Sequence, residues 1–251
     1  MEKINVCINC DDFGLSPEIN LGIFKAIEEG LLGSCSVLMN EQSLADYQKL
    51  NSLDIDLGLH FSLTTSNQKV HSPLGLCWSY LTGKTDQTWI NQQLTEQLEL
   101  FRKVFAREPL FIDTHQNIHY LPFVRREVAK QLIKLQTDIL RIPVESSSYF
   151  SLKKIMYQAL FPFENNFIPF WGLGHMGKNF NEQRILNQLE YLKNKNLKYS
   201  LWMVHLGNYS EGHFGDSYNQ ERVNELETLL SLKNKIIDKA NLIKFSEIES
   251  N

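Results

Sequence analysis

Segments with the pattern of a β-strand alternate with segments of helical periodicity along the whole chain. Short runs rich in Val, Ile and Leu are expected as buried strands, and longer runs with apolar residues three or four apart as helices. This alternation favours a parallel sheet with helical crossovers. With seven or eight such units in 251 residues, we expect an α/β fold, a single-domain irregular (β/α) barrel of seven or eight strands spanning residues 1–251. The alternative is a doubly wound open sheet, although no glycine-rich dinucleotide or phosphate fingerprint follows any predicted strand.

Local signals set the bounds of the expected elements. Ser16-Pro17-Glu18 supplies a serine cap and a proline at the first helical position, which predicts a helix that runs to Glu29. The predicted strands are 4–9, 34–39, 56–60, 110–113, 138–143, 198–205 and 241–245, and the predicted helices are 16–29, 43–53, 94–105, 122–135, 181–196 and 219–231. Residues 61–87 are expected to be irregular, and the aromatic-rich stretch 146–178 has no regular pattern.

Composition excludes several classes of protein. The chain is 43% hydrophobic and 22% charged with a net charge of −4, and its Lys and Arg residues are dispersed, unlike the basic footprint of a nucleic-acid-binding protein. No apolar stretch approaches the roughly 20 residues that span a bilayer. Because the N-terminus lacks the organisation of a signal peptide, we expect a cytoplasmic protein.

Cysteine usage fits a reducing compartment. Cys7 and Cys10 have the CxxC spacing of redox and zinc sites. On an extended strand, however, residues three apart point to opposite faces, and the chain holds no second such pair. We therefore expect Cys7, Cys10, Cys35 and Cys77 to be reduced thiols, most of them buried.

Ionisable side chains stand at the ends of five predicted strands. They are Asp11 and Asp12, His60, Asp113 with His115, Arg141, and His205. In a (β/α) barrel the carboxyl ends of the strands converge on one face, where active sites are built. Each residue alone fits a structural role such as a turn cap or an ion pair, but their joint occurrence favours a single site.

These residue types suit metal-assisted hydrolysis of an amide or ester. Adjacent carboxylates repel one another unless a cation lies beside them. One carboxylate and two imidazoles leave positions on a metal open to water and substrate, and a metal-bound water can attack a carbonyl carbon near neutral pH. A second carboxylate can act as general base, and a further histidine can stabilise the oxyanion or protonate the leaving amine.

Segments spread over nearly the whole chain resemble the YdjC-like carbohydrate deacetylases, a family that includes chito-oligosaccharide deacetylases. They occur in family order: Asn9-Cys10-Asp11-Asp12-Phe13-Gly14-Leu15-Ser16, Asn20-Leu21-Gly22-Ile23, Gly58-Leu59-His60-Phe61-Ser62-Leu63-Thr64, Ile112-Asp113-Thr114-His115-Gln116-Asn117-Ile118-His119, Leu140-Arg141, Val204-His205 and Arg222…Glu225-Leu226. The first three motifs together are highly specific.

The resemblance implies a barrel of the glycoside hydrolase and deacetylase type, which removes N-acetyl groups from an amino sugar or chito-oligosaccharide. Carried over by position, the metal ligands are Asp12, His60 and His115, the catalytic residues are Asp11 (the base) and His205, and the substrate-binding residues are Asp113, Arg141 and His119. The resemblance implies Mg²⁺, whereas a His-His-Asp set suits Zn²⁺ better. It also suggests a homodimer.

The chain departs from the family pattern at three places. Cys10 replaces the usual alanine, Asn117 stands where a third histidine is frequent, and His205-Leu206-Gly207 replaces His-Pro-Gly. These departures bear on the identity of the substrate more than on the type of reaction.

The sequence also allows other roles for four aromatic residues and two alternative functions for the protein. Trp78, Tyr80, Phe170 and Trp171 either stack on sugar rings or pack a loop against the barrel. A non-catalytic carbohydrate-binding or regulatory protein is one alternative function, but such a protein has no need of Asp11 beside Asp12. A metal-dependent isomerase or phosphoesterase is another, disfavoured because no lysine stands at a strand end and no phosphate loop is present.

Overall fold

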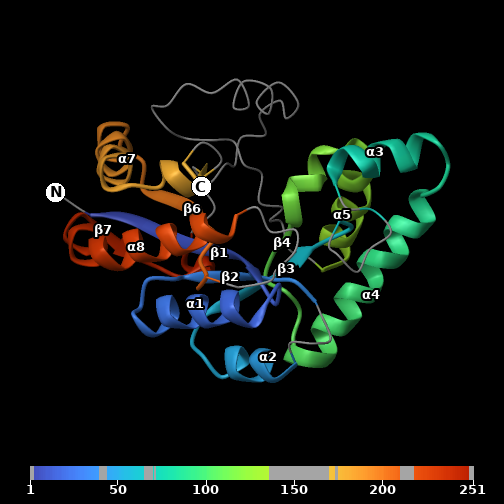
Figure 1. Cartoon of the computed structure of the whole chain (residues 1–251), viewed down its shortest axis with the longest axis horizontal. Coiled ribbons are helices and arrows are strands. Elements are labelled where there is room, and N and C mark those ends of the chain that lie inside the picture. The colour runs from blue at the N-terminus through green and yellow to red at the C-terminus, as the bar shows by residue number, and fades with distance from the viewer. Residues whose placement is uncertain are drawn as a thin grey trace. The chain divides into compact units, whose positions relative to one another are not determined.

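The computed structural model describes residues 3–39, 44–64, 70, 72–135, 170–172, 175–209 and 218–248 (Figure 1). The chain divides into two compact units, one made of residues 1–35 with 142–251 and the other of residues 36–141. The predicted strand 138–143, with Arg141, lies outside the described residues.

The first unit has a parallel sheet at its centre. Its strands are β1 (Ile4–Phe13), β5 (Phe170–Trp171), β6 (Tyr199–Val204) and β7 (Ala240–Leu242), and its helices are α1 (Pro17–Glu28), α7 (Glu182–Asn194) and α8 (Asn219–Lys239), with 3₁₀ turns at Gly177–Asn179 and Phe245–Glu247. Strand β1 pairs with β6 and with β7, and β5 pairs with the other edge of β6. Helices α1 and α7 both pack against α8. Strand β1 is buried along almost its entire length, so it forms the core of this unit.

The second unit repeats the strand–helix pattern. It contains β3 (Asp56–Phe61), β4 (Ile112–Thr114), α2 (Leu44–Asn51), α3 (Pro73–Leu81), α4 (Gln87–Phe105), α5 (Pro122–Leu135) and a 3₁₀ segment at His115–Tyr120. The strand order is β4-β3-β2, and β3 pairs in parallel with β4. Strand β2 (Ser34–Val37) carries the chain from the first unit into the second. Helix α4 buries an apolar stripe made of Ile90, Leu94, Leu98, Phe101 and Phe105.

The parallel α/β architecture is confirmed, whereas the described residues do not show closure into a barrel of seven or eight strands. Several element bounds differ from the prediction. Helix α3 occupies part of the stretch expected to be irregular, and α4 starts at Gln87 because the side chain of Asp86 caps it. Strand β1 runs on to Phe13, past the expected end at Asn9, and α8 continues to Lys239.

Two of the four aromatic side chains considered for sugar stacking belong to the core. Phe170 and Trp171 are fully buried in β5, so neither ring is available to a ligand. Tyr80 stacks face to face on Phe123, with the ring centroids 4.0 Å apart. Trp78 differs from these three, since its side chain is 66% exposed on α3.

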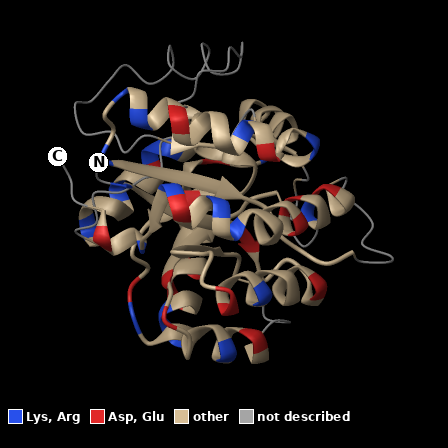
Figure 2. Cartoon of the chain, turned by 90° about the vertical axis from the view of Figure 1, so that its left-hand side faces the viewer, with Lys and Arg blue, Asp and Glu red and all other residues tan. Residues whose placement is uncertain are grey.

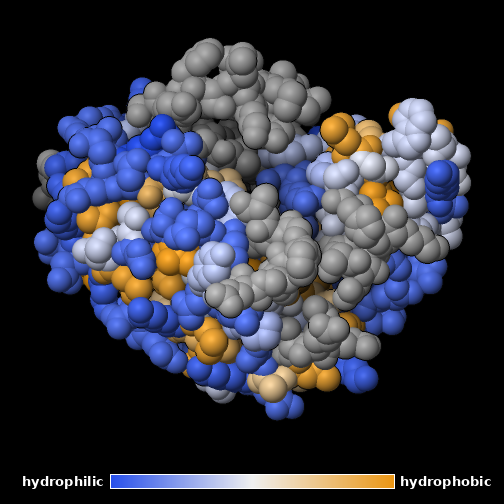
Figure 3. Space-filling model, viewed as in Figure 1, coloured by the Kyte–Doolittle hydropathy of each residue, from blue (hydrophilic) through white to orange (hydrophobic). Residues whose placement is uncertain are grey.

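The surface is mixed in charge and largely polar. Lys and Arg alternate with Asp and Glu along the helices in Figure 2, and the hydrophobic residues on the face drawn in Figure 3 lie in small separate areas. No helix within the described residues has the length and apolar character needed to cross a membrane. All four cysteines are free thiols, and only Cys77 is partly exposed.

Candidate functional site

The aspartate pair lies at the carboxyl end of β1, where the backbone departs from regular strand geometry. Asp11 and Asp12 are both buried. Neighbours on a regular strand point to opposite faces, but Asp12 has a φ of 69°, in the left-handed region, and this breaks the alternation. Asp adopts this region more readily than most residues. Gly14, with a φ of 95°, completes the bend that begins at Asp12.

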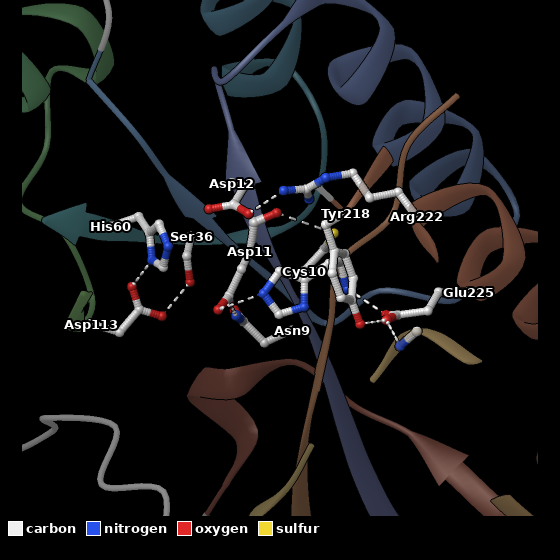
Figure 4. Close-up of polar contacts among 12 residues, drawn as sticks. Asn9, Cys10, Asp11, Asp12, Ser36, His60, Asp113, Tyr218, Arg222 and Glu225 are labelled. Atoms are coloured by element: carbon white, nitrogen blue, oxygen red, sulfur yellow. Dashed lines mark hydrogen bonds and ion pairs between the residues drawn. The ribbon is translucent and has the colours of Figure 1, made fainter. Parts of the chain in front are cut away.

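A buried arginine neutralises Asp12. Arg222 of α8 donates from Nη2 to Asp12 Oδ2 at 2.7 Å, and both side chains are 3% exposed (Figure 4). A buried carboxylate is tolerated only when such a partner compensates for its lost hydration. Arg222 is part of the family pattern, but the sequence alone did not predict a role for it in the site.

Asp11 has a different set of partners. Asn9 Nδ2 donates to Asp11 Oδ1 at 2.7 Å, and Ser34 Oγ donates to Asn9 Oδ1 at the same distance. His205, which follows β6, brings its Nε2 to 3.9 Å from Asp11 Oδ2. That distance permits an ion pair but exceeds a hydrogen bond. The first unit thus brings Asp11 and His205 together while holding Asp11 through its other oxygen.

In the second unit, His60 and Asp113 are directly opposite each other on β3 and β4. His60 Nδ1 lies 2.5 Å from Asp113 Oδ1, and Ser36 Oγ donates to Asp113 Oδ2 at 2.6 Å (Figure 4). A carboxylate can only accept hydrogen bonds, so the proton is on His60 Nδ1 and Nε2 is the nitrogen that can coordinate a metal. This carboxylate–imidazole arrangement is typical of metal-ligating histidines.

The segment after β4 carries the other two histidines of the motif. The ring of His115 meets that of His60 edge to face, with centroids 5.6 Å apart. The ring of His119 is fully buried, and its Nδ1 lies 2.5 Å from Thr114 Oγ1. Asn117 has a φ of 53°, a left-handed conformation in which Asn is favoured.

The histidines of the second unit suit a metal ion. The rings of His60 and His115 meet within this unit, and the family motifs predict Asp12 of the first unit as a third ligand. Two imidazoles suit a borderline transition metal such as zinc, and the carboxylate also accommodates magnesium. The Asp113 contact fixes the tautomer of His60 that coordination through Nε2 requires.

A buried glutamate of α8 was not among the expected site residues. Glu225 accepts hydrogen bonds from the backbone N–H of Gly177 (2.6 Å), the backbone N–H of His205 (2.7 Å) and the hydroxyl of Tyr218 (2.7 Å). Burial raises the pKa of Glu225 to about 7, although the two backbone donors act in the opposite direction. Burial, and next the Glu225 carboxylate, raise the pKa of the Tyr218 hydroxyl.

Comparison with known proteins identifies the family. A family model described as YdjC-like protein matches residues 5–236. The chain belongs to the YdjC-like family. The chitooligosaccharide deacetylase of Yersinia enterocolitica is 26% identical to this YdjC-like chain over 244 residues, and that of Yersinia pestis (strain Pestoides F) is 27% identical over 243 residues. Each alignment covers 92% of both chains.

A solved structure supports the same fold for this YdjC-like chain. A protein from Enterococcus faecalis V583 superimposes with a TM-score of 0.70 over 96% of this chain and 97% of that chain, at 20% sequence identity. The expected resemblance to the YdjC-like family is therefore confirmed. The roles assigned to individual residues stay predictions.

Proposed function

We propose that this YdjC-like protein is a metal-dependent hydrolase that removes N-acetyl groups from an amino sugar or chito-oligosaccharide. The observation that carries this proposal is the division of the aspartate pair. Asp12 is neutralised by Arg222, whereas Asp11 lies beside His205. Two adjacent carboxylates in different environments are suited to two different roles. The chitooligosaccharide deacetylases of Yersinia, aligned over 92% of the chain, suggest the class of substrate.

Asp12, His60 and His115, the ligands predicted from the family motifs, would hold one divalent ion, Mg²⁺ or Zn²⁺. When bound, such an ion makes water a better nucleophile and polarises the carbonyl of the acetyl group. Asp113 was predicted to bind substrate, but its complete burial and its contact with His60 favour a role in orienting that ligand. Substrate binding by His119 and Arg141 stays a prediction.

Asp11 and His205 would transfer protons during the reaction, and Asn9 and Arg222 would hold the two carboxylates in place. Asp11 takes a proton from the attacking water, and the amide of Asn9 fixes the carboxylate for this transfer. His205 gives a proton to the nitrogen of the leaving amine as the C–N bond breaks. Arg222 keeps Asp12 ionised, because protonation of that carboxylate would leave the buried guanidinium without its counter-charge.

Acetate release from N,N′-diacetylchitobiose tests the proposal. Wild-type protein is expected to release acetate, EDTA to abolish the activity, and Mg²⁺ or Zn²⁺ to restore it. The His60→Ala variant should lose both bound metal and turnover. Activity that persists after metal removal and in His60→Ala would overturn the ligand assignment.

The Asp11→Asn variant separates an enzyme from a carbohydrate-binding protein. Removal of the base is expected to lower turnover by about 10²-fold or more while substrate binding is retained. If wild-type protein bound the sugar without turnover, and the Asp11→Asn variant bound it equally well, the non-catalytic alternative would be favoured instead.

A further inference from the structure

Helix α8 carries two buried side chains that lie about one turn apart. Each of them contacts a different segment of the candidate site in the first unit. Arg222 contacts Asp12, and Glu225, three residues on, contacts the backbone of His205. Both side chains are almost completely buried. Figure 4 shows them extending from the same helix. Glu225 has no part in the proton transfers proposed above, so its burial and its three hydrogen bonds need a separate explanation.

The Glu225 carboxylate ties three segments together at His205. Its Oε2 accepts the His205 N–H, and its Oε1 accepts both the Gly177 N–H and the Tyr218 O–H. The Tyr218 ring also meets the His205 ring edge to face, with centroids 5.5 Å apart. The position of the His205 backbone and the environment of its ring therefore both depend on one carboxylate and its neighbour.

The residues after His205 are fixed as well. Gly207 lies so close to α1 that a Cβ at Gly22 would meet its Cα at 2.5 Å, and Asn208 N–H donates to the carbonyl of Glu18 at 3.0 Å. Leu206 is fully buried. This leaves little freedom in the chain at His205, and Glu225 is the side chain that fixes its amide.

We propose that Glu225 is a positioning residue, which holds the His205 imidazole beside Asp11 by binding the His205 amide, with the Tyr218 hydroxyl keeping the carboxylate in place. The inference rests on the proposed function, because it assigns His205 a proton to deliver. It extends that function to residues that touch neither substrate nor metal.

The ionised carboxylate accepts a hydrogen bond from every group that contacts it in this environment. All three neighbouring groups are donors, and each Glu225 oxygen accepts at least one of them. Glutamine has the same shape but one acceptor oxygen and one NH₂ donor. One orientation of the amide would place that NH₂ against the His205 N–H, and the other would place it against Gly177 and Tyr218. A buried donor left without an acceptor is costly, so we expect the segment at His205 to shift.

The test compares Glu225→Gln with Glu227→Gln, which makes the same change on an exposed residue of α8. Each variant is assayed on N,N′-diacetylchitobiose and on 4-nitrophenyl acetate, whose leaving group departs without protonation. We expect Glu225→Gln to lower kcat for the amide by about 10²-fold with KM within a few-fold of wild type, and to change ester hydrolysis much less. The Glu227→Gln variant should match wild type on both substrates.

A second readout does not depend on turnover. The ring signal of His205 in protein with ¹³C-labelled histidine, assigned by its loss in His205→Gln, should shift in Glu225→Gln and stay in place in Glu227→Gln. If wild-type protein releases no acetate, the proposed function fails, and this signal alone decides whether Glu225 positions His205. A folded Glu225→Gln variant with an unchanged signal and an unchanged amide-to-ester ratio would overturn the inference.

Tyr218→Phe keeps the inference testable should Glu225→Gln not fold. It removes the hydroxyl that donates to Oε1 and leaves the ring and the two backbone donors. A smaller shift of the His205 signal and a smaller fall in the amide-to-ester ratio are expected. If neither quantity changes, the inference is wrong.

Discussion

At the scale of single residues, the site depends on backbone and side-chain partners that composition does not reveal. The sequence predicted that Asp11 and Asp12 share a site, because two adjacent acids end an apolar run. It did not predict that Asp12 itself has a left-handed backbone. Many residue types can follow a strand, so the residue type alone does not show which residue turns the chain. Nor did it predict Arg222 as the partner of Asp12, because these two residues are 210 positions apart.

Removing one partner of the buried ion pair between Asp12 and Arg222 should strongly destabilise the protein. Arg222→Met leaves a buried carboxylate without its counter-charge, so we expect the free energy of unfolding to fall by about 3–5 kcal/mol. Urea denaturation monitored by circular dichroism measures the change. Lys233→Met is the matched control, because Lys233 pairs with Glu29 at the surface and should change stability by less than about 1 kcal/mol. Equal effects of the two substitutions would contradict this prediction.

Asp113 should act on metal affinity through His60. Asp113→Asn replaces the acceptor of the His60 Nδ1 proton with an amide that can turn a donor toward it, so we expect metal binding about 10–100-fold weaker. Competition with a fluorescent chelator measures the affinity for Zn²⁺ and Mg²⁺. Glu99→Gln, on the exposed face of α4, serves as the charge control. An unchanged affinity in Asp113→Asn would show that Asp113 does not orient a ligand.

At the scale of helices and strands, prediction succeeded where a cap coincided with an apolar stripe. Ser16 caps α1 with Pro17 in its first turn, and Asn181 caps α7 (Glu182–Asn194), which lies within the predicted residues 181–196. Helix α3 was not predicted, although Ser72 and Pro73 form the same serine cap and first-turn proline as in α1. Its nine residues are mostly apolar, so they show no contrast between a polar and an apolar face that would indicate a helix. The start of α4 was missed because its first turn is polar apart from Trp89, while periodic burial begins at Ile90.

Because α1 contacts the segment after β6, a glycine-to-alanine change in α1 is predicted to destabilise the protein, whereas the same change in most helices is stabilising. Alanine normally stabilises a helix by about 0.5–1 kcal/mol relative to glycine. At Gly22 its Cβ would meet the backbone of Gly207 at 2.5 Å, so we expect Gly22→Ala to destabilise the protein by about 1–3 kcal/mol. We also expect it to lower turnover, because His205 lies two residues before Gly207. Urea midpoints and acetate release measure the two effects, and a gain in stability would refute the proposed contact.

At the scale of the whole molecule, the α/β class followed from the alternation of strands and helices, and the family from motifs spread along the chain. The division into two compact units did not follow, because no change in composition marks residues 35 and 141. One domain over residues 1–251 stays a prediction. Contacts such as that of Glu225 with His205 depend on which helix packs against which strand, and the pattern of a single helix does not contain that information.

The pH dependence of global stability should contain a contribution from Glu225. Its pKa, about 7 in the folded protein against an ordinary value of 4.5, means that the folded state binds the proton more tightly than the unfolded state. This contribution is fully present below pH 4.5 and is lost as the pH rises to about 7, for a total of about 3 kcal/mol. The charged and titratable side chains that act on Glu225 include Tyr218 and Arg222, and both oppose the rise in its pKa.

A comparison of wild type with Glu225→Gln isolates this contribution, because the amide does not titrate. The difference in the free energy of unfolding, wild type minus variant, should decline between pH 4.5 and pH 7 and be constant above that range. Urea titrations at half-unit steps of pH provide the measurement. A difference that rises over this interval would show that the pKa of Glu225 is not elevated in the folded protein.

The pairing of β1 with β6 and β7 has a consequence for biosynthesis. A ribosome releases β1, with Asp11 and Asp12 at its end, well before its partners, which start at Tyr199 and Ala240. The first unit therefore cannot be completed until most of the chain has been made, although residues 36–141 have all of their own strands and helices earlier. A nascent chain that stalls before residue 199 would present an apolar strand without these two partners, and an unpaired strand edge is open to aggregation and to chaperone capture during translation.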